Sequence, residues 1–70
     1  MIEVYEKEDG CGRLCIAEVN DQTLKVVIKV KGNSALDSKK DTFELKSKEA
    51  LETFVEIEVK RKGYKKTGGF

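Results

Sequence analysis

The stretch "SKEALETFVEIEVKRKGY", residues 47–64, decides the fold. Its pattern fits a helix over the whole length, but its last part also fits a β-strand. Ser47 is a favourable N-cap, and Glu49 falls in the first turn, where a carboxylate stabilises the helix dipole. The apolar residues at helical spacing form one stripe, Ala50, Leu51, Phe54 and Ile57. Basic residues 60–62 suit a last turn, and Gly63 suits the position after it.

The end of the same stretch also alternates in the manner of a strand. Apolar residues at positions 55, 57 and 59 stand between charged residues at 56, 58 and 60. The N-cap, the stripe and Gly63 agree on a single helix, which is our prediction. A fifth strand over residues 55–61, after a short helix, is the alternative.

Four segments before residue 47 predict strands. The clearest is "LKVVIKVK", residues 24–31, where β-branched residues alternate with period two. Its two faces are Leu24, Val26, Ile28 and Val30 on one side and Lys25, Val27, Lys29 and Lys31 on the other. The remaining candidates are "IEVYEK" (2–7), "RLCIAEV" (13–19) and "DTFEL" (41–45).

The connections between these segments favour a meander. Asp9-Gly10 is a hairpin dipeptide, because type I′ turns need positive φ at both central residues. "NDQ" at Asn20 to Gln22 suits a second tight turn. The third connection, residues 32–41, is long and polar, as functional or mobile loops often are.

These elements predict an α+β fold, a four-stranded antiparallel meander with one C-terminal helix packed across the sheet. The chain has 70 residues, enough for one small domain, which we assign to residues 1–64, followed by a basic tail at 65–70. The expected core is Ile2, Val4, Leu14, Ile16, Leu24, Val26, Ile28, Val30, Phe43, Leu45, Leu51, Phe54 and Ile57.

The composition argues against several functional classes. No apolar run approaches the ~20 residues of a membrane span, and acidic residues at 3, 6, 8 and 9 do not fit a secretory signal. We therefore expect a cytoplasmic protein with reduced thiols and no membrane contact. Cys11 and Cys15 lack the C-x-x-C spacing of zinc and redox sites, and the chain has no His, so we expect no metal and no cofactor.

Catalytic signatures are missing as well. Without His the commonest general base is absent, and the carboxylates are scattered along exposed faces. The glycines of "TGGF" at the C-terminus precede no helix that would present its N-terminus to a phosphate. We expect a protein that is not an enzyme.

Residues 43–64 resemble the C-terminal half of the WGR family, in which a strand with an aromatic residue leads into S-x-E-A-x-x-x-F and a basic K-x-x-G-Y/W ending. The matching residues are Phe43, Ser47, Glu49, Ala50, Phe54, Lys60, Lys62, Gly63 and Tyr64. The resemblance implies antiparallel strands, a polar loop and a helix across the sheet, and it favours nucleic acid as partner. The family's Trp-Gly-Arg triplet is replaced by "IKVKG" at residues 28–32, so its DNA-end contacts carry over to no residue here.

The basic residues are unevenly distributed along the chain. From Lys60 onward there are five basic residues and no acidic one, whereas the preceding part has nine basic and thirteen acidic residues, a balance of −4. Basic groups on a strand, a loop and the tail suit a phosphate backbone, and Tyr64 between them suits stacking on a base. The predicted nucleic-acid-binding residues are Lys25, Lys29, Lys31, Lys39, Lys40, Lys60, Arg61, Lys62, Tyr64, Lys65 and Lys66.

Two functions are consistent with these features. The first is a non-catalytic module that binds nucleic acid through these residues, with DNA favoured over RNA. The alternative is a small subunit or inhibitor that binds a protein partner, and the near-neutral pI of about 7.7 suits it at least as well. No feature of the sequence specifies an oligomeric state.

Overall fold

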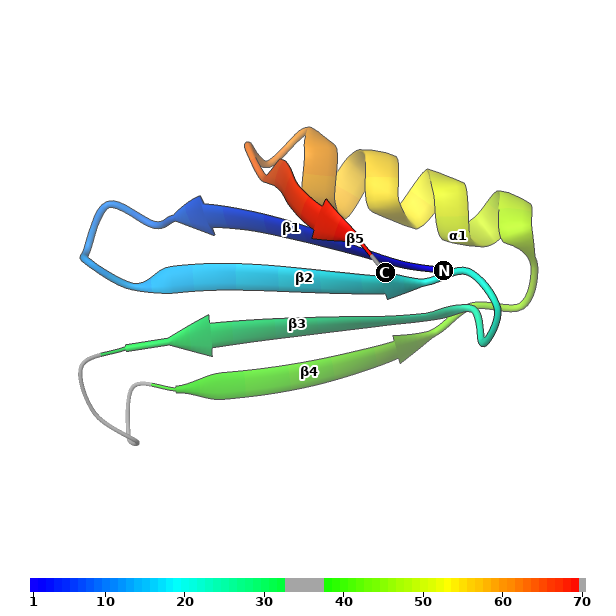
Figure 1. Cartoon of the computed structure of the whole chain (residues 1–70), viewed down its shortest axis with the longest axis horizontal. Coiled ribbons are helices and arrows are strands. Elements are labelled where there is room, and N and C mark those ends of the chain that lie inside the picture. The colour runs from blue at the N-terminus through cyan, green and yellow to red at the C-terminus, as the bar shows by residue number, and fades with distance from the viewer. Residues whose placement is uncertain (33–37, 70) are drawn as a thin grey trace.

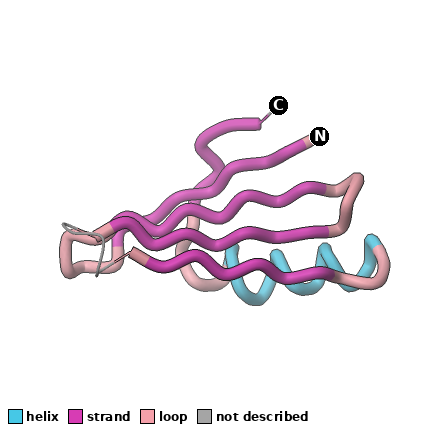
Figure 2. Tube along the Cα trace, turned by 90° about the horizontal axis from the view of Figure 1, so that it is seen from below, coloured by secondary structure: helices cyan, strands magenta, loops and turns pink. Residues whose placement is uncertain are grey.

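The computed structural model describes residues 1–32 and 38–69, and all statements about structure refer to these residues. They form an antiparallel sheet in the order β4-β3-β2-β1-β5, with one helical segment on one side of it (Figures 1 and 2). The elements are β1 (Ile2–Glu8), β2 (Leu14–Asn20), β3 (Lys25–Lys31), β4 (Lys39–Glu44), α1 (Lys48–Val55), the π-helical turn η2 (Glu56–Lys60) and β5 (Lys65–Gly69). The α+β class and the antiparallel sheet with a C-terminal helix are as predicted.

The prediction of four strands is wrong, because the described chain has five. The segment expected to be a basic tail forms β5, which pairs antiparallel with the outer edge of β1 from Glu3↔Gly69 to Glu6↔Lys65. Every residue of β5 is exposed, so its sequence has none of the apolar alternation that marks a half-buried strand. The helix returns the chain to the free edge of β1, where backbone pairing becomes possible.

Residues 48–60 are helical, so the alternative of a strand at this place does not hold. The Ser47 side chain accepts a hydrogen bond from the Ala50 N–H at 3.1 Å, which is the predicted N-cap. At the other end the N–H of Gly63 donates to the carbonyl of Lys60, and that of Tyr64 donates to the carbonyl of Val59. This pair of bonds is a Schellman motif, and Gly63 supplies its left-handed residue with φ of +95°.

The buried stripe of the helix agrees with the predicted one at Leu51 and, through packing against the core, at Phe54, but it then continues along a different line. Its buried residues are Leu51, Val55 and Val59, at intervals of four. Ile57, placed in the core by the sequence pattern, is 45% exposed. In a regular α-helix, four residues overshoot a full turn by about 40°, so residues at intervals of four gradually rotate away from the sheet. The i→i−5 bond from the Arg61 N–H to the Glu56 carbonyl widens the last turn and keeps Val59 above the sheet.

In β1 and β2 the buried face of the sheet is also not the one that was predicted. The buried residues of these strands are Tyr5, Cys15, Ala17 and Val19, whereas the predicted core residues Ile2, Val4, Leu14 and Ile16 are only half-buried on the opposite face. Both faces of these strands carry apolar side chains, so alternation alone does not choose between them.

The β3 face was predicted correctly. Val26 is fully buried, and Leu24, Ile28, Leu45 and Phe54 pack against the core from around it. Phe43 is 37% exposed, but its ring lies 5.0 Å from that of Phe54 between ring centroids. The helix therefore covers β1, β2 and β3 and reaches β4 through this aromatic pair.

The third connection is shorter than predicted, because β4 begins at Lys39. Lys39 and Lys40 are therefore strand residues rather than loop residues. Residues 33–37 of the predicted loop lie outside the described residues. In the first connection, one carboxylate oxygen of Asp9 accepts hydrogen bonds from the N–H groups of Cys11 and Arg13, so this side chain organises the loop.

Candidate functional site

The face of the sheet away from the helix is not covered by any element of residues 1–32 and 38–69 (Figure 2). Because side chains alternate along a strand, the neighbours of buried Tyr5, Ala17 and Val26 point to this side. We call it the open face. On β1 to β4 it carries Ile2, Val4, Glu6, Glu8, Leu14, Ile16, Glu18, Asn20, Lys25, Val27, Lys29, Lys31, Lys40, Thr42 and Glu44.

The open face has an acidic side and a basic side. Across the strands, Glu8, Leu14 and Lys31 stand in one row, and Glu6, Ile16 and Lys29 in the next. In both rows a carboxylate on β1 and an ammonium group on β3 flank an apolar residue of β2. Lys40 of β4 lies directly opposite Lys29 and extends the basic side outward.

Two of the basic side chains on this face already have carboxylate partners. The Nζ atom of Lys29 lies 2.6 Å from Glu18, and that of Lys25 lies 3.5 Å from Glu44. Lys31 and Lys40 have no ion pair with any described residue. The positive charge available to a partner is therefore at Lys31 and Lys40 on one side and at Lys65 of β5 on the opposite edge.

Between the charges the open face is apolar. Its apolar residues are half-buried although no described element packs on them: Ile2, Val4, Leu14, Ile16 and Val27. The register places Ile16 diagonally beside Val4 on one neighbouring strand and beside Val27 on the other, within reach of contact. An apolar centre with a charged rim is the usual composition of a protein interface.

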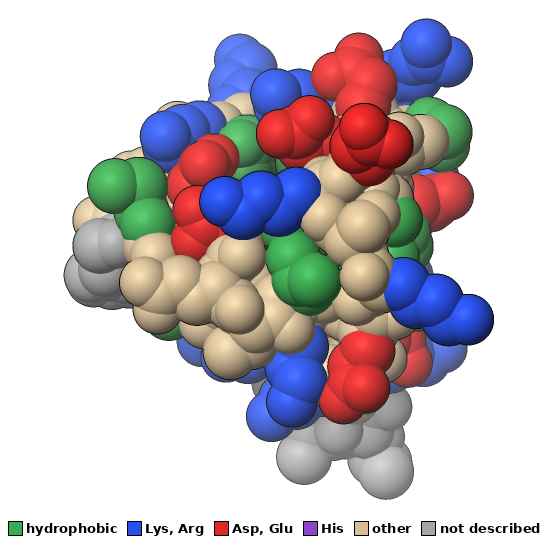
Figure 3. All heavy atoms as spheres, turned by 90° about the vertical axis from the view of Figure 1, so that its right-hand side faces the viewer, with side chains coloured by type: hydrophobic (Ala, Val, Ile, Leu, Met, Phe, Trp, Pro, Cys, Tyr) green, Lys and Arg blue, Asp and Glu red, His purple; other side chains and the backbone are tan. Residues whose placement is uncertain are grey.

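The basic residues at the end of the helix lie elsewhere and are largely paired with carboxylates. Lys62 contacts Glu58 at 2.7 Å, and Arg61 contacts Glu56 at 4.0 Å. On β5, Lys66 contacts Glu3 at 3.7 Å on the helix side of the sheet. Acidic and basic side chains are also interspersed at the opposite end of the molecule, where the helix begins (Figure 3). No strongly positive field results from such mixing.

Tyr64 is half-buried and packs against the core. The Nζ atom of Lys7 lies 4.8 Å from the centroid of its ring, so a cation occupies the position where a stacked base was expected. Burial is the largest cause of the raised pKa of Tyr64, followed by the electrostatic effect of Cys15 and a hydrogen bond with it. The ring thus has a clear structural role.

The predicted binding residues are therefore divided among several places. The structure brings together, on the open face, Lys25, Lys29, Lys31, Lys40 and Lys65. Lys39 lies opposite Val30, on the helix side of the outer strand β4. Lys60, Arg61 and Lys62 surround the last turn of the helix. A single flat polyanion does not contact all of these groups at once.

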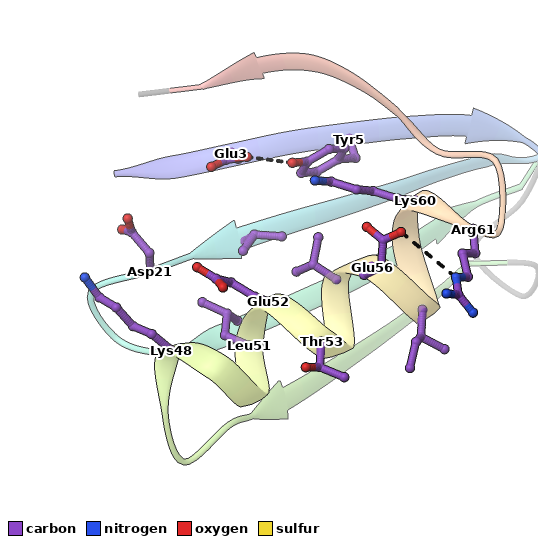
Figure 4. A pocket seen from close by; sticks show the side chains of 13 residues that line it. Glu3, Tyr5, Asp21, Lys48, Leu51, Glu52, Thr53, Glu56, Lys60 and Arg61 are labelled. Carbon is purple, nitrogen blue, oxygen red and sulfur yellow. Dashed lines mark hydrogen bonds and ion pairs between the residues drawn. The ribbon is translucent and has the colours of Figure 1, made fainter.

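A groove of about 680 Å³ runs between the helix and the β1 edge (Figure 4). In it the Tyr5 hydroxyl donates a hydrogen bond to Glu3 at 2.6 Å, and Lys60 extends toward Tyr5. Burial, the hydrogen bond to Glu3 and the charge of Glu3 raise the pKa of Tyr5 to about 12. The Tyr5 phenol therefore stays protonated at neutral pH and cannot serve as a general base there.

Other functional groups are sparse within the described ranges. No cluster of three or more metal-binding side chains occurs in residues 1–32 and 38–69. Cys11 is an exposed thiol in the first loop, and Cys15 is a buried thiol on β2. None of the described helical segments has the length and apolarity needed to cross a membrane.

Searches of protein-family models, curated proteins and solved structures found no match to this chain. The candidate site therefore rests on the geometry of the open face. Sequence reasoning placed Val27 and the lysines of β3 on this face, but it assigned Ile2, Val4, Leu14 and Ile16 to the core. The signal that pointed to the correct face was the second alternation in β2, Cys15, Ala17 and Val19, which competes with Leu14 and Ile16.

Proposed function

We propose that this protein is a non-catalytic binding module that docks a protein partner on the open face. The observation that carries the proposal is the group of half-buried apolar side chains in the centre of that face, with Ile16 in their middle. Contiguous apolar surface that no described element covers is characteristic of an interaction site.

The state of the lysines supports a protein partner over a nucleic acid. Lys25 and Lys29 are paired with Glu44 and Glu18, so a phosphate has to compete with a carboxylate already in contact. Acidic residues also share the face with the basic ones and repel a polyanion. A protein partner satisfies both signs, with basic groups opposite β1 and acidic groups opposite β3 and β4.

Nucleic-acid binding is the second candidate. It is favoured by the direct juxtaposition of Lys29 and Lys40 on neighbouring strands, with Lys31 at the end of the same face. The resemblance to the WGR family adds to it, with DNA as the expected ligand, and stays a prediction. Fluorescence anisotropy with labelled duplex and single-stranded oligonucleotides over a salt series tests this candidate. Binding that weakens with salt and is lost in Lys31→Ala would support it.

The main proposal is tested by capture experiments with two matched variants. Ile16→Arg places a charge in the centre of the open face, and Ile57→Arg makes the same change at an exposed position on the helix. Purified, tagged protein of each kind is incubated with lysate, without and with nuclease treatment, after thermal melts have established that each variant is folded.

We expect a discrete protein that the unmodified chain and Ile57→Arg retain and Ile16→Arg does not. Equal retention by both variants would overturn the assignment of the open face. Retention abolished by nuclease would favour the second candidate.

A further inference from the structure

We propose that the occupant of the open face is a second copy of this chain, packed face to face about a two-fold axis parallel to the strands. This inference rests on the proposed function and specifies its partner. It is carried by the way charges are distributed about β2, the strand midway between the acidic and the basic sides.

The geometry follows from the strand order. β1 and β3 lie on either side of β2, so a two-fold axis that runs along β2 places β1 of one copy over β3 of the other. Such an axis preserves position along the strands. Aligned sheets in β-sandwiches pack in this manner, with a rotation of about 30° between them from their twist.

The contacts that result are complementary. Glu8 of one copy comes over Lys31 of the other, because both occupy the same row of the register and neither has a described ion pair. Glu6 comes over Lys29 in the next row, but Lys29 already contacts Glu18 and Glu6 accepts a hydrogen bond from Thr67, so the main charge contact is Glu8 with Lys31. Symmetry produces each contact twice. A two-fold axis perpendicular to the strands would instead place β1 over β1 and reverse position along the strands, so Glu8 would not come over Lys31. Only the parallel axis produces this pairing of opposite charges.

The apolar residues meet under the same operation. Leu14 and Ile16 of β2 face their own symmetry copies, and Val4 of one copy comes over Val27 of the other, since these two share a row. Glu18 faces its own copy, but Lys29 at 2.6 Å neutralises its charge. The outer strands bring Lys65 near Lys40 at the rim, where water and salt screen the repulsion.

The area sets the strength of the dimer. The four strands β1 to β4, which have six or seven residues each, form a footprint of roughly 24 by 19 Å, about 450 Å² on each copy. Stable interfaces bury about 800 Å² on each partner. We therefore expect a reversible dimer with a dissociation constant in the micromolar range.

The test exchanges one pair of charges. Glu8→Lys and Lys31→Glu are both at exposed positions without a described ion pair, so each leaves the fold intact. In Glu8→Lys both position 8 and position 31 are positively charged, and in Lys31→Glu both are negatively charged. Each variant alone should dimerise about tenfold more weakly, and an equimolar mixture should form a heterodimer at least as strong as the original dimer.

The measurement is sedimentation equilibrium of the purified full chain from micromolar to near-millimolar concentration, with the salt dependence recorded. Lys46→Glu and Glu52→Lys make the same charge changes at exposed positions off the open face and should leave the dissociation constant unchanged. A misfolded variant does not rescue its partner in the mixture, so rescue supports the proposal independently of stability.

Three outcomes would overturn the proposal. One is a chain that stays monomeric throughout the concentration range. Another is a dimer that both variants form as tightly as the unmodified chain, which would indicate pairing through the exposed edge of β4. The third is a mixture that fails to associate. If the chain is monomeric but Ile16→Arg still abolishes capture of another protein, the docking function stands and only the identity of the partner is wrong.

Discussion

The helix register in the structure and the sequence pattern make opposite predictions about whether Val59 or Ile57 contributes more to stability. Val59 is 0% exposed, whereas Ile57 is 45% exposed, although the pattern places Ile57 in the apolar stripe. Substituting each by alanine therefore measures which side of the helical segment faces the sheet. Alanine is the best helix former, so neither change disrupts the backbone.

The magnitudes follow from the burial. Val59→Ala removes two methyl groups from a site without water, at about 0.8 kcal/mol each, and a cavity term raises the loss above 2 kcal/mol. The better helix propensity of alanine returns about 0.5 kcal/mol, which leaves a net loss of roughly 1.5–2 kcal/mol. Ile57→Ala removes three carbons that are about half in water already, for a net loss of roughly 0.7 kcal/mol.

The assay is thermal unfolding followed by circular dichroism, with urea unfolding as a second measurement. In a domain of this size 1 kcal/mol shifts Tm by about 4–8 °C, so Val59→Ala should lower Tm by roughly 6–16 °C and Ile57→Ala by only about 3–6 °C. Unchanged m-values would show that both variants unfold to the same extent. A larger loss for Ile57→Ala would mean that the last turn is α-helical and rotated, which contradicts the π-helical turn.

Two further predictions concern Tyr5 and β5. The pKa of Tyr5 is raised from 10.0 to about 12, so between these values the unfolded chain ionises first and the free energy of unfolding should fall, by up to about 2–3 kcal/mol. Tyr5→Phe should remove this alkaline loss, and equal pH slopes in both proteins would contradict the assigned cause. Deleting residues 65–70 removes the cross-strand pairing of β5 with β1, but β5 is exposed throughout, and the relieved ordering of this segment largely offsets the lost pairing. We expect a Tm shift of a few degrees, and complete unfolding of the truncated chain would show that β5 is essential to the sheet.

The sequence by itself determined the elements whose signals are local. Period-two alternation identified β3 and its buried face, and Ser47 and Gly63 marked the two ends of the helix by capping chemistry. These signals succeed because a cap or an alternating strand is specified by residues a few positions apart. The lysines of the open face on β3 followed from the same alternation.

Only the tertiary structure decided which faces are covered. β1 and β2 are apolar on both sides, and the helix selects the side of Tyr5 and Ala17 by packing on it. The other side keeps Ile16 and its neighbours as the open face. β5 could not be predicted, because its exposed residues gain their strand conformation from backbone pairing with β1, which composition does not record. The division of charge about β2 likewise exists only once the strands are in register, since Glu8 and Lys31 are far apart along the chain and share a row in the sheet.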